Sequence, residues 1–428
     1  MHLNQIRLEH FRGATNLVIN LDAKLNVFYG NNGAGKSTIL DAAALALSRT
    51  INRITAHQSS KKTFLETDIQ NGQNQSSIAI AGECFQVSFD HQYMKIRNGR
   101  FAGAGRSAAS IQPSIEKLRS ILLNNEHSNV PVLLYYPVNR TVLDIPLKIK
   151  TKHDFDVINT YDESLTGAAN FRTFFEWFRN REDIENELLK PIRGFDAEQL
   201  TQIDWNKYRD SQLQAVRTAI CTFMPEFSDL TIRRSPLRME ITKNKETLRV
   251  EQLSDGEKCL MAMIGDIARR LVIANPSCDN PLDGDGIILI DEIDLHLHPT
   301  WQHMIISQLI KTFRNCQFLI STHSPLVITH IFPVNLFSLA MCSGKLTVEK
   351  PHESYGRNVI RILEDLMGLP TTRPDEIEKR IKNIYALIAE WELEKAANKI
   401  EELKKLIGDD PEFARAKMLL QRKESISA

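Results

Sequence analysis

The segment GNNGAGKS, residues 30–37, has the residue types and the spacing of a loop that binds phosphate groups. It matches G-x-x-x-x-G-K-[S/T] at every fixed position, after the apolar run LNVFY and before the helix-forming run STILDAAALALS. Glycines let backbone N–H groups surround the phosphates, and the following helix adds the positive end of its dipole. We therefore expect a nucleotide to be bound by Asn31, Asn32, Gly33, Ala34, Gly35, Lys36, Ser37 and Thr38.

The segment GIILIDEID, residues 286–294, predicts the other half of this site, because an apolar strand ends there in paired acids. We expect ATP and Mg²⁺ as cofactors, with Lys36 at the β- and γ-phosphates and the Ser37 hydroxyl on Mg²⁺. Asp291 is predicted to hold Mg²⁺, directly or through water, and Glu292 to polarise the attacking water as the general base. Two acids that only cap a strand would not explain the apolar run before them.

His323 follows another apolar run, in FLISTHSP, and is predicted to lie at the same edge of a sheet. Open α/β sheets bind ligands at the carboxyl ends of their strands. We therefore expect His323 to act in catalysis by contacting the γ-phosphate and the attacking water. His296 and His298, in DLHLHP, are interpreted as residues that shape the turn after the acids and a subunit contact, and not as a zinc pair.

Two further polar residues are candidates for the same site. Gln70, in TDIQNG, is a candidate Mg²⁺ ligand, although an ordinary glutamine in a polar loop explains it equally well. Arg12, in HFRG, is a candidate to approach the nucleotide from the first pair of strands, and a role without the nucleotide explains it equally well.

The segment QLSDGEK, residues 252–258, predicts the start of a second helix that faces a phosphate. Ser254 and Glu257 have the S-x-x-E spacing of a capping box, which accounts for the helix start. Gly256 is not explained in this way, because glycine in a first helical turn costs about 1 kcal/mol relative to alanine. A glycine there allows a large group to approach the helix N-terminus, and a phosphate is the candidate for this group.

The composition is that of an ordinary protein without a membrane or secretion signal. Lys+Arg and Asp+Glu both number 53 among 428 residues, so no overall basic field favours nucleic acid or an anionic membrane. The six cysteines are scattered without metal-binding spacing, which indicates reduced thiols and a cytoplasmic location. One segment, RSPLRMEITKNKETLR (residues 234–249), is locally basic.

Short apolar strands that alternate with amphipathic helices predict an α/β fold with a mostly parallel sheet covered by helices. We expect an N-terminal ATPase lobe over residues 1–100 and an inserted, largely helical region over residues 101–245. A C-terminal ATPase lobe is expected over residues 246–350. Residues 351–428 are expected to form a helical tail, because apolar residues recur there among Lys and Glu; its apolar face is interpreted as an oligomer or partner surface.

The order of the phosphate loop, LSDGE, ILIDE and STH resembles the ABC-type ATPases. IRLEHFRG and DEIDLHLHP further resemble the RecF, SMC and Rad50 branch, in which two ATPs lie between two heads. This resemblance implies a P-loop ATPase head, and it implies that Ser254 and Gly256 serve the γ-phosphate bound to a partner head. The interval between Lys36 and Ser254 is too short and too poor in heptads for the long arms of SMC or Rad50.

Three segments are similar to the PtuA family, the ATPase subunits of Septu-type antiphage systems, which are also attached to retrons. They are LLYYPVNRTVLDIP (133–146), FRTFFEWFRNREDIENE (171–187) and DEIDLHLHPTWQ (291–302). Membership implies a homo-oligomeric ATPase that binds and controls a separate HNH nuclease of the PtuB type. A retron reverse transcriptase with its msDNA, and DNA itself, are further candidate partners. We expect no nuclease activity in this chain, and we interpret HDFD (153–156) as a solvated loop.

Two other classes of protein remain open at this point. A RecF-like DNA-repair or DNA-clamping ATPase would need a basic stripe on one face, for which the locally basic segment is the candidate. A transporter ATPase is disfavoured, because the helical insert and coupling motifs of that class are not recognisable in the sequence.

Overall fold

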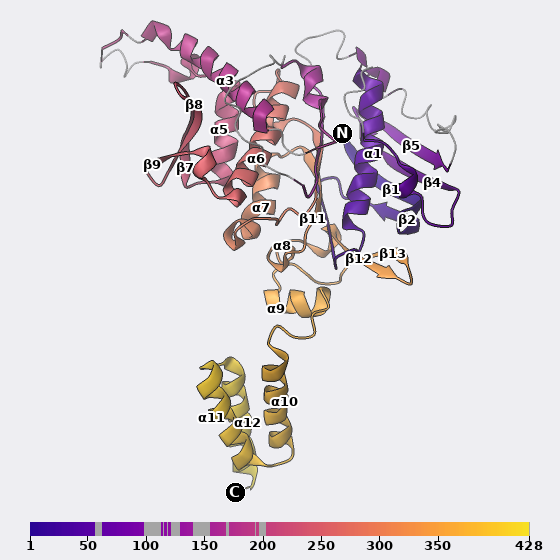
Figure 1. The fold of residues 1–428 in the computed structure, drawn as a ribbon, viewed down its shortest axis with the longest axis vertical. Coiled ribbons are helices and arrows are strands. Elements are labelled where there is room, and N and C mark those ends of the chain that lie inside the picture. The colour runs from indigo at the N-terminus through magenta and orange to yellow at the C-terminus, as the bar shows by residue number, and fades with distance from the viewer. Residues whose placement is uncertain are drawn as a thin grey trace. The chain divides into compact units, whose positions relative to one another are not determined.

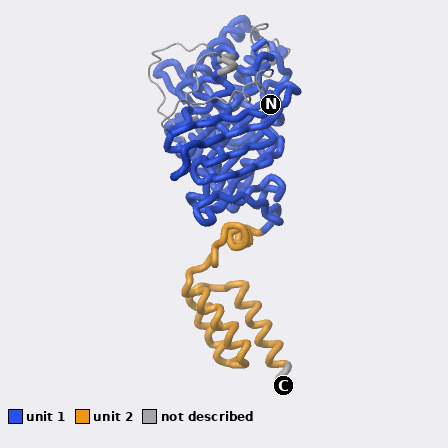
Figure 2. The backbone as a smooth tube through the Cα atoms, turned by 90° about the vertical axis from the view of Figure 1, so that its right-hand side faces the viewer, with its two compact units in different colours: residues 1–357 blue, residues 358–428 orange. Residues whose placement is uncertain are grey.

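The computed structural model describes residues 1–55, 62–97, 113, 115–117, 119–120, 129–139, 155–167, 171–192, 194–196 and 203–427. It divides into two compact units, residues 1–357 (unit 1) and residues 358–428 (unit 2) (Figure 2). Residues 140–146 of the first PtuA-like segment lie outside the described residues. The same is true of His153 and Asp154 in HDFD.

Unit 1 is built around a six-stranded sheet in the order β13-β12-β3-β11-β10-β6 (Figure 1). Its five strands from β12 to β6 are parallel, and β13 is antiparallel at one edge. Every residue of β6, β10 and β11 is buried, as the apolar runs predict for parallel strands covered on both faces. The strands are β3 (Leu25–Gly30), β6 (Val132–Tyr136), β10 (Gly286–Ile290), β11 (Cys316–Ser321), β12 (Leu336–Cys342) and β13 (Lys345–Glu349).

Two antiparallel sheets flank this core. One has the order β2-β1-β4-β5 and the other the order β7-β8-β9. The first comprises β1 (His2–Phe11), β2 (Ala14–Asn20), β4 (Gln75–Cys84) and β5 (Val87–Ile96). The second comprises β7 (Phe227–Arg234), β8 (Leu237–Lys243) and β9 (Glu246–Arg249).

The helices of unit 1 contact the central sheet and one another. Helix α1 contacts β3, β6, β10 and β11, while α6 contacts β6, α3 and α5. The α-helices are α1 (Lys36–Thr55), α3 (Phe171–Leu188), α5 (Ser211–Phe223), α6 (Asp255–Ala274), α7 (Pro299–Thr312) and α8 (Pro325–Ile328). Short 3₁₀ turns are η1 (Glu66–Asp68), η2 (Val157–Tyr161), η3 (Lys190–Ile192), η4 (Trp205–Tyr208), η5 (Val250–Gln252), η6 (Pro281–Asp283) and η7 (Pro333–Asn335).

The range 101–245, expected to be a largely helical insertion, contains strands in two places. Strand β6 lies within it and pairs in parallel with β10 at the edge of the central sheet. Strands β7 and β8 also lie within it and form most of the three-stranded sheet. The reason is local: β6 is wholly apolar, and β7 and β8 are joined by a tight turn at Ser235–Pro236. The α/β fold class with a mostly parallel sheet and a C-terminal helical region is confirmed.

Unit 2 is a small helical bundle. It comprises α9 (Val359–Arg361), the π-helical turn η8 (Ile362–Leu366), α10 (Asp375–Ala389), α11 (Leu393–Ile407) and α12 (Pro411–Ser427). Most of the apolar residues that predicted an amphipathic tail pack into the core of this bundle: Ile381, Ile384, Ile388, Ile400 and Leu403. They therefore bury one another. Two other apolar residues of this unit, Leu406 and Trp391, are 61% and 50% exposed.

All six cysteines are free thiols, as their scattered spacing predicts. Among the described helices, none is both long enough and apolar enough to span a membrane.

Candidate functional site

The central sheet brings the predicted motifs to one edge. β3, β11 and β10 are neighbouring parallel strands, with Phe28 beside Ser321 and Ile320 beside Ile290. Their carboxyl ends therefore lie together, and each is followed by one motif: the phosphate loop after β3, the paired acids after β10 and His323 after β11. The sequence alone predicted this convergence.

The phosphate loop has the curled backbone that its glycines predict. Gly33 and Gly35 have φ values of +76° and +93°, a region that other residues rarely adopt. The Lys36 ammonium donates hydrogen bonds to the carbonyl oxygens of Gly30 (3.0 Å) and Asn31 (3.1 Å), on the inner side of the loop. The ammonium of Lys36 is thus hydrogen-bonded to the backbone of its own loop.

The charge of Lys36 is partly desolvated. The side chain is buried, and this burial lowers the pKa of the ammonium, while the negative charges of Glu292, Asp291 and Asp294 act in the opposite direction. These interactions place the three carboxylates near the ammonium. A buried ammonium group has already lost most of its water. It can therefore bind an anion at a smaller desolvation cost than a fully hydrated ammonium group. The polyphosphate of a nucleotide is such an anion.

Asp291 and Glu292 are held in place by Ser321, which sequence reasoning missed. The Ser321 hydroxyl donates a hydrogen bond to the Asp291 carboxylate, and the Glu292 N–H donates to the Ser321 oxygen at 2.7 Å. Asp291 is 2% exposed, and its N–H donates to the Tyr136 carbonyl at the end of β6 (2.8 Å). The sequence signal for Ser321 was a polar residue at the end of an apolar strand.

Glu292 has a left-handed backbone, with φ of +47°. A non-glycine residue in this region is uncommon and is concentrated at functional sites. The turn separates the side chains of the two acids, so that Asp291 is buried while the Glu292 side chain is 30% exposed. One Glu292 carboxylate oxygen lies 3.9 Å from Nε2 of His323.

His323 faces Glu292 from the end of β11. The backbone N–H of His323 donates to a carboxylate oxygen of Asp294 (3.2 Å). The same oxygen accepts a hydrogen bond from the Thr322 hydroxyl (2.6 Å). Burial, followed by the nearby charge of Lys36, lowers the pKa of His323, and Glu292 only partly opposes this. The imidazole is therefore neutral near pH 7, and a neutral ring can both donate and accept a hydrogen bond.

The donor set at this edge fits Mg²⁺. Mg²⁺ prefers oxygen ligands and keeps waters, so that one or two carboxylates and the phosphates of the substrate are enough. The buried Asp291 carboxylate receives a hydroxyl hydrogen bond and no ion pair among the described residues, and Ser37 is half-buried at the start of α1. In the described part of the chain, no group of three or more His, Cys, Asp or Glu side chains is arranged so that these side chains alone could hold a metal ion.

The two histidines after the acids have contacts that belong to the turn. His298 is the N-cap of α7, and its Nδ1 accepts the N–H of Thr300 at 3.3 Å. His296 has a left-handed backbone, with φ of +62°. These contacts agree with the interpretation that both residues shape this loop.

Arg12 and Gln70, the two further candidates, are bound within the chain. Arg12 donates to Asp41 (2.7 Å) and Asp68 (2.9 Å). Gln70 donates to the Thr15 hydroxyl (3.1 Å), and its side-chain oxygen lies 3.2 Å from Nδ1 of His10. Among the described residues, none of these contacts reaches the phosphate loop or Asp291. Their assignment to the nucleotide stays a prediction.

Sequence reasoning also missed a charged cluster next to this edge. The Lys62 ammonium lies 2.5 Å from a carboxylate oxygen of Asp41 and 4.0 Å from the centroid of the Tyr135 ring, and the Tyr135 hydroxyl donates to Asp41. Burial lowers the pKa of Lys62, whereas Asp41 and, more weakly, Asp291 raise it. Tyr135 ends an apolar run in the sequence, but no sequence pattern singled out Lys62.

The start of α6 has the predicted capping box but a different reason for its glycine. The Glu257 N–H donates to the Ser254 hydroxyl (3.3 Å), and the Ser254 N–H donates to the Glu257 carboxylate (2.7 Å). A Cβ atom on Gly256 would lie 2.2 Å from the carbonyl oxygen of His296. The need for glycine at position 256 is therefore explained by the loop after the paired acids, which packs against this helix start, and not by room for a phosphate.

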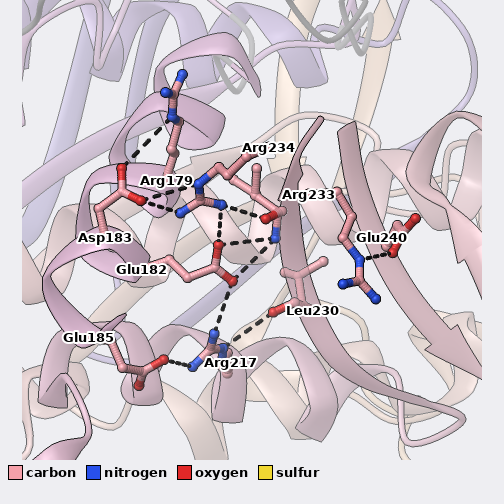
Figure 3. Close-up of polar contacts among 10 residues, drawn as sticks. Arg179, Glu182, Asp183, Glu185, Arg217, Leu230, Arg233, Arg234 and Glu240 are labelled. Atoms are coloured by element: carbon pink, nitrogen blue, oxygen red, sulfur yellow. Dashed lines mark hydrogen bonds and ion pairs between the residues drawn. The ribbon is translucent and has the colours of Figure 1, made fainter. Parts of the chain in front are cut away.

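The locally basic segment pairs with acids of the same chain (Figure 3). Arg234 bonds to Glu182 (2.6 Å) and contacts Asp183, and Arg233 donates to Glu240 (2.8 Å). Arg238 also donates to Glu240 (2.6 Å). The charge of these arginines is thereby neutralised. These ion pairs reduce the free basic charge that a DNA clamp would need, while Lys245 and Arg249 of the segment remain exposed.

The fold and this edge together define a P-loop ATPase. The family described as an AAA ATPase domain matches residues 1–328. The chain is 34% identical to the retron Ec83 probable ATPase of Escherichia coli over 396 residues, which cover 79% of this chain and 71% of that protein. It is 31% identical to the retron Vc95 probable ATPase of Vibrio cholerae serotype O1 biovar El Tor over 423 residues, which cover 89% and 81%.

A third relative carries the name predicted from the sequence. The Septu protein PtuA of Bacillus thuringiensis is 24% identical over 391 residues, covering 87% of this chain and 85% of that protein. Among solved structures, an SMC head bound to the C-winged helix domain of ScpA aligns at 15% identity with a TM-score of 0.48, covering 82% of this chain and 98% of that one. The chain belongs to the AAA ATPase domain family and, within it, to the group of retron ATPases and Septu PtuA proteins. It is an ATPase.

Proposed function

We propose that this ATPase is the regulatory subunit of an antiphage defence complex, in which ATP-driven pairing of two heads controls a separate HNH nuclease. Relatives named as retron ATPases and Septu PtuA support the defence role. A retron reverse transcriptase with its msDNA is a further proposed partner, in line with those names.

The observation that carries the pairing of heads is the exposed start of α6. Most of this 20-residue helix is buried, yet its N-cap, Ser254, and its first residue, Asp255, are exposed. Within the described residues, the polar contacts of Ser254 go to the first turn of its own helix and not to its own phosphate loop. A helix N-terminus with an exposed hydroxyl can accept the γ-phosphate bound to a second chain.

In the proposed reaction each residue has one task. The phosphate loop binds ATP, with Lys36 at the β- and γ-phosphates. Ser37 and Asp291 would hold Mg²⁺, which when bound neutralises charge on the phosphates. Glu292 polarises a water in line with the γ-phosphate, and the neutral His323 orients that water or the phosphate oxygen. Ser254 of the second chain completes the site.

Mixing two inactive variants tests the contact between chains. Neither Lys36→Ala nor Ser254→Arg should hydrolyse ATP alone. A mixture should regain activity, because one of the two sites in a hybrid pair combines an intact phosphate loop with an intact Ser254. Recovered activity should approach about one quarter of the parent rate for random pairing of equal amounts, with one working site per hybrid. Failure of every mixing ratio to hydrolyse ATP would refute action between chains.

Co-purification tests the nuclease partner. The tagged chain, expressed with its neighbouring genes, should carry along a protein with nuclease activity, whereas the chain expressed alone should have none. Isolation of the chain without such a partner from its native operon would refute this part of the proposal.

A further inference from the structure

The start of α6 carries a negative charge next to the hydroxyl that the proposed function assigns to a phosphate. The Glu257 carboxylate accepts hydrogen bonds from the Ser254 hydroxyl (2.8 Å) and from its N–H (2.7 Å) through the same oxygen. A phosphate that reaches Ser254 would therefore lie close to a carboxylate. Like charges at such short range repel each other, and most strongly where two chains exclude water.

Lys243, the last residue of β8, compensates this charge from the other side. Its ammonium lies 2.5 Å from the second carboxylate oxygen of Glu257 and 5.4 Å from the centroid of the Phe227 ring. Phe227 and Lys243 are direct partners in the β7–β8 pairing. Burial raises the pKa of Glu257, but the hydrogen bonds from Lys243 and Ser254 outweigh it, so that the pKa is lowered and the carboxylate stays ionised.

The ion pairs of the small sheet fix the strand that carries Lys243. Arg233 and Arg238 both donate to Glu240 on β8. Arg234 joins β7 to Glu182 of α3 (Figure 3). The strand therefore holds Lys243 beside α6 before any nucleotide arrives. A group that is fixed in advance loses little conformational freedom when its site is completed.

We infer that Lys243 is a positioning residue of the ATPase, which neutralises Glu257 so that an ATP phosphate on a second chain can approach Ser254. A capping box alone does not need this lysine, because Ser254 and Glu257 already satisfy each other's hydrogen bonds. The inference rests on the proposed pairing of heads.

Removal of the lysine charge tests the inference. In a Glu292→Gln background, where ATP is bound but hydrolysed slowly, Lys243→Met should weaken ATP-dependent association of two chains about tenfold, measured by sedimentation velocity. Steady-state ATPase assays in the parent background should give a higher KM at the same protein concentration. Lys243→Arg, which keeps the charge, should associate like the parent.

A second substitution separates charge from structure. Glutamine also serves in a capping box, so Lys243→Met with Glu257→Gln removes both charges and keeps the helix start. This double variant should associate within about threefold of the parent, because the repulsion has been removed. If the double variant associates as weakly as Lys243→Met, Lys243 is only structural and the inference is overturned.

Arg238→Met is the matched control. The Arg238 side chain is 27% exposed and Lys243 is 29% exposed, and each forms an ion pair with a buried glutamate, but the partner of Arg238 is Glu240 and not α6. The control should leave association unchanged, because Arg233 still bonds to Glu240 and keeps this strand in place. If Lys243→Met matches this control, only the inference is overturned. If the Glu292→Gln chain itself shows no association with ATP, the proposed pairing is overturned and the inference with it.

Discussion

Unit 1 holds two regions rich in charge that are organised in opposite ways. At the nucleotide edge, the Lys36 ammonium donates hydrogen bonds to two carbonyl oxygens, and the charges of Glu292, Asp291 and Asp294 oppose the lowering of its pKa by burial. In the network of α3, α5, β7 and β8, each drawn guanidinium meets a carboxylate or a carbonyl oxygen (Figure 3). Glu182 accepts hydrogen bonds from the Ile232 N–H and from Arg234, and it forms an ion pair with Arg217 at 3.5 Å.

The difference shows how charge serves function in one region and structure in the other. A charge that is to bind a substrate must remain incompletely compensated within the chain, at some cost in stability. A charge that only joins elements is stable when it is fully paired, and removal of one partner leaves the other buried and uncompensated. Substitutions in the two regions should therefore affect activity and stability in opposite proportions.

The largest effect is expected from Lys36→Ala. It should lower kcat/KM for ATP hydrolysis about a thousandfold or more, because the phosphates lose their buried cation. It should not lower the free energy of unfolding, since burial disfavours the charged ammonium in the folded chain. Nucleotide binding by fluorescence and unfolding in urea measure the two quantities. A marked loss of stability with normal ATP binding would mean that Lys36 serves structure and not function, and it would contradict the distinction between the two regions.

Glu292→Gln should lower kcat about a hundred- to a thousandfold, because an amide cannot act as the general base. ATP binding should be retained, since the phosphate loop is intact, and a single-turnover assay with labelled ATP would measure both steps. Equal losses of binding in Glu292→Gln and in Lys36→Ala would contradict the separate roles assigned to these residues.

In the network, Glu182→Ala should lower the free energy of unfolding by about 3 kcal/mol, because it leaves Arg234 and Arg217 without a shared buried partner. Glu182 is 9% exposed on its side chain, whereas its neighbour Asp183 is 53% exposed. Asp183→Ala, the control, should cost less than about 1 kcal/mol. Urea denaturation measures both changes. A Glu182→Ala chain that is as stable as the control would refute the structural role of the network.

The smallest expected effect is a pH dependence at His323. Its pKa is lowered in the folded chain, mainly by burial, so its contribution to stability is present above the unfolded pKa and is lost as pH falls through the folded pKa. The contribution should stay below about 1 kcal/mol, because the ring is partly exposed to solvent. His323→Gln should therefore reduce the loss of stability between about pH 7.5 and about pH 5.5. An unchanged pH profile would contradict this assignment.

The nucleotide edge was far easier to predict than the network. Its motifs are short, and each follows a strand that is apolar along its whole length, such as GIILI before Asp291. The network joins residues distant in sequence, such as Glu182 and Arg234, whose spacing has no periodic signal. The segment that contains Arg234 was interpreted as locally basic because its acidic partner Glu182 is distant in the sequence.

Sequence reasoning was also incomplete where the role of a residue depends on a contact with a distant loop. Gly256 was assigned to a phosphate because the sequence gives no sign of the His296 carbonyl oxygen that lies against it. Ser321 and Lys62 were missed because one hydroxyl or one lysine has no pattern of its own. Their roles depend on the positions of Asp291 and Asp41.

The sequence by itself determined the class of protein, the edge of the sheet at which its motifs meet, and the capped start of α6. It could do so because local patterns of apolar residues, glycines and caps fix strands, loops and helix ends. Only the tertiary structure decided which charges are paired and which remain available, including the meeting of Lys243 with Glu257. Pairing depends on distances between chain segments that strand order and packing alone establish.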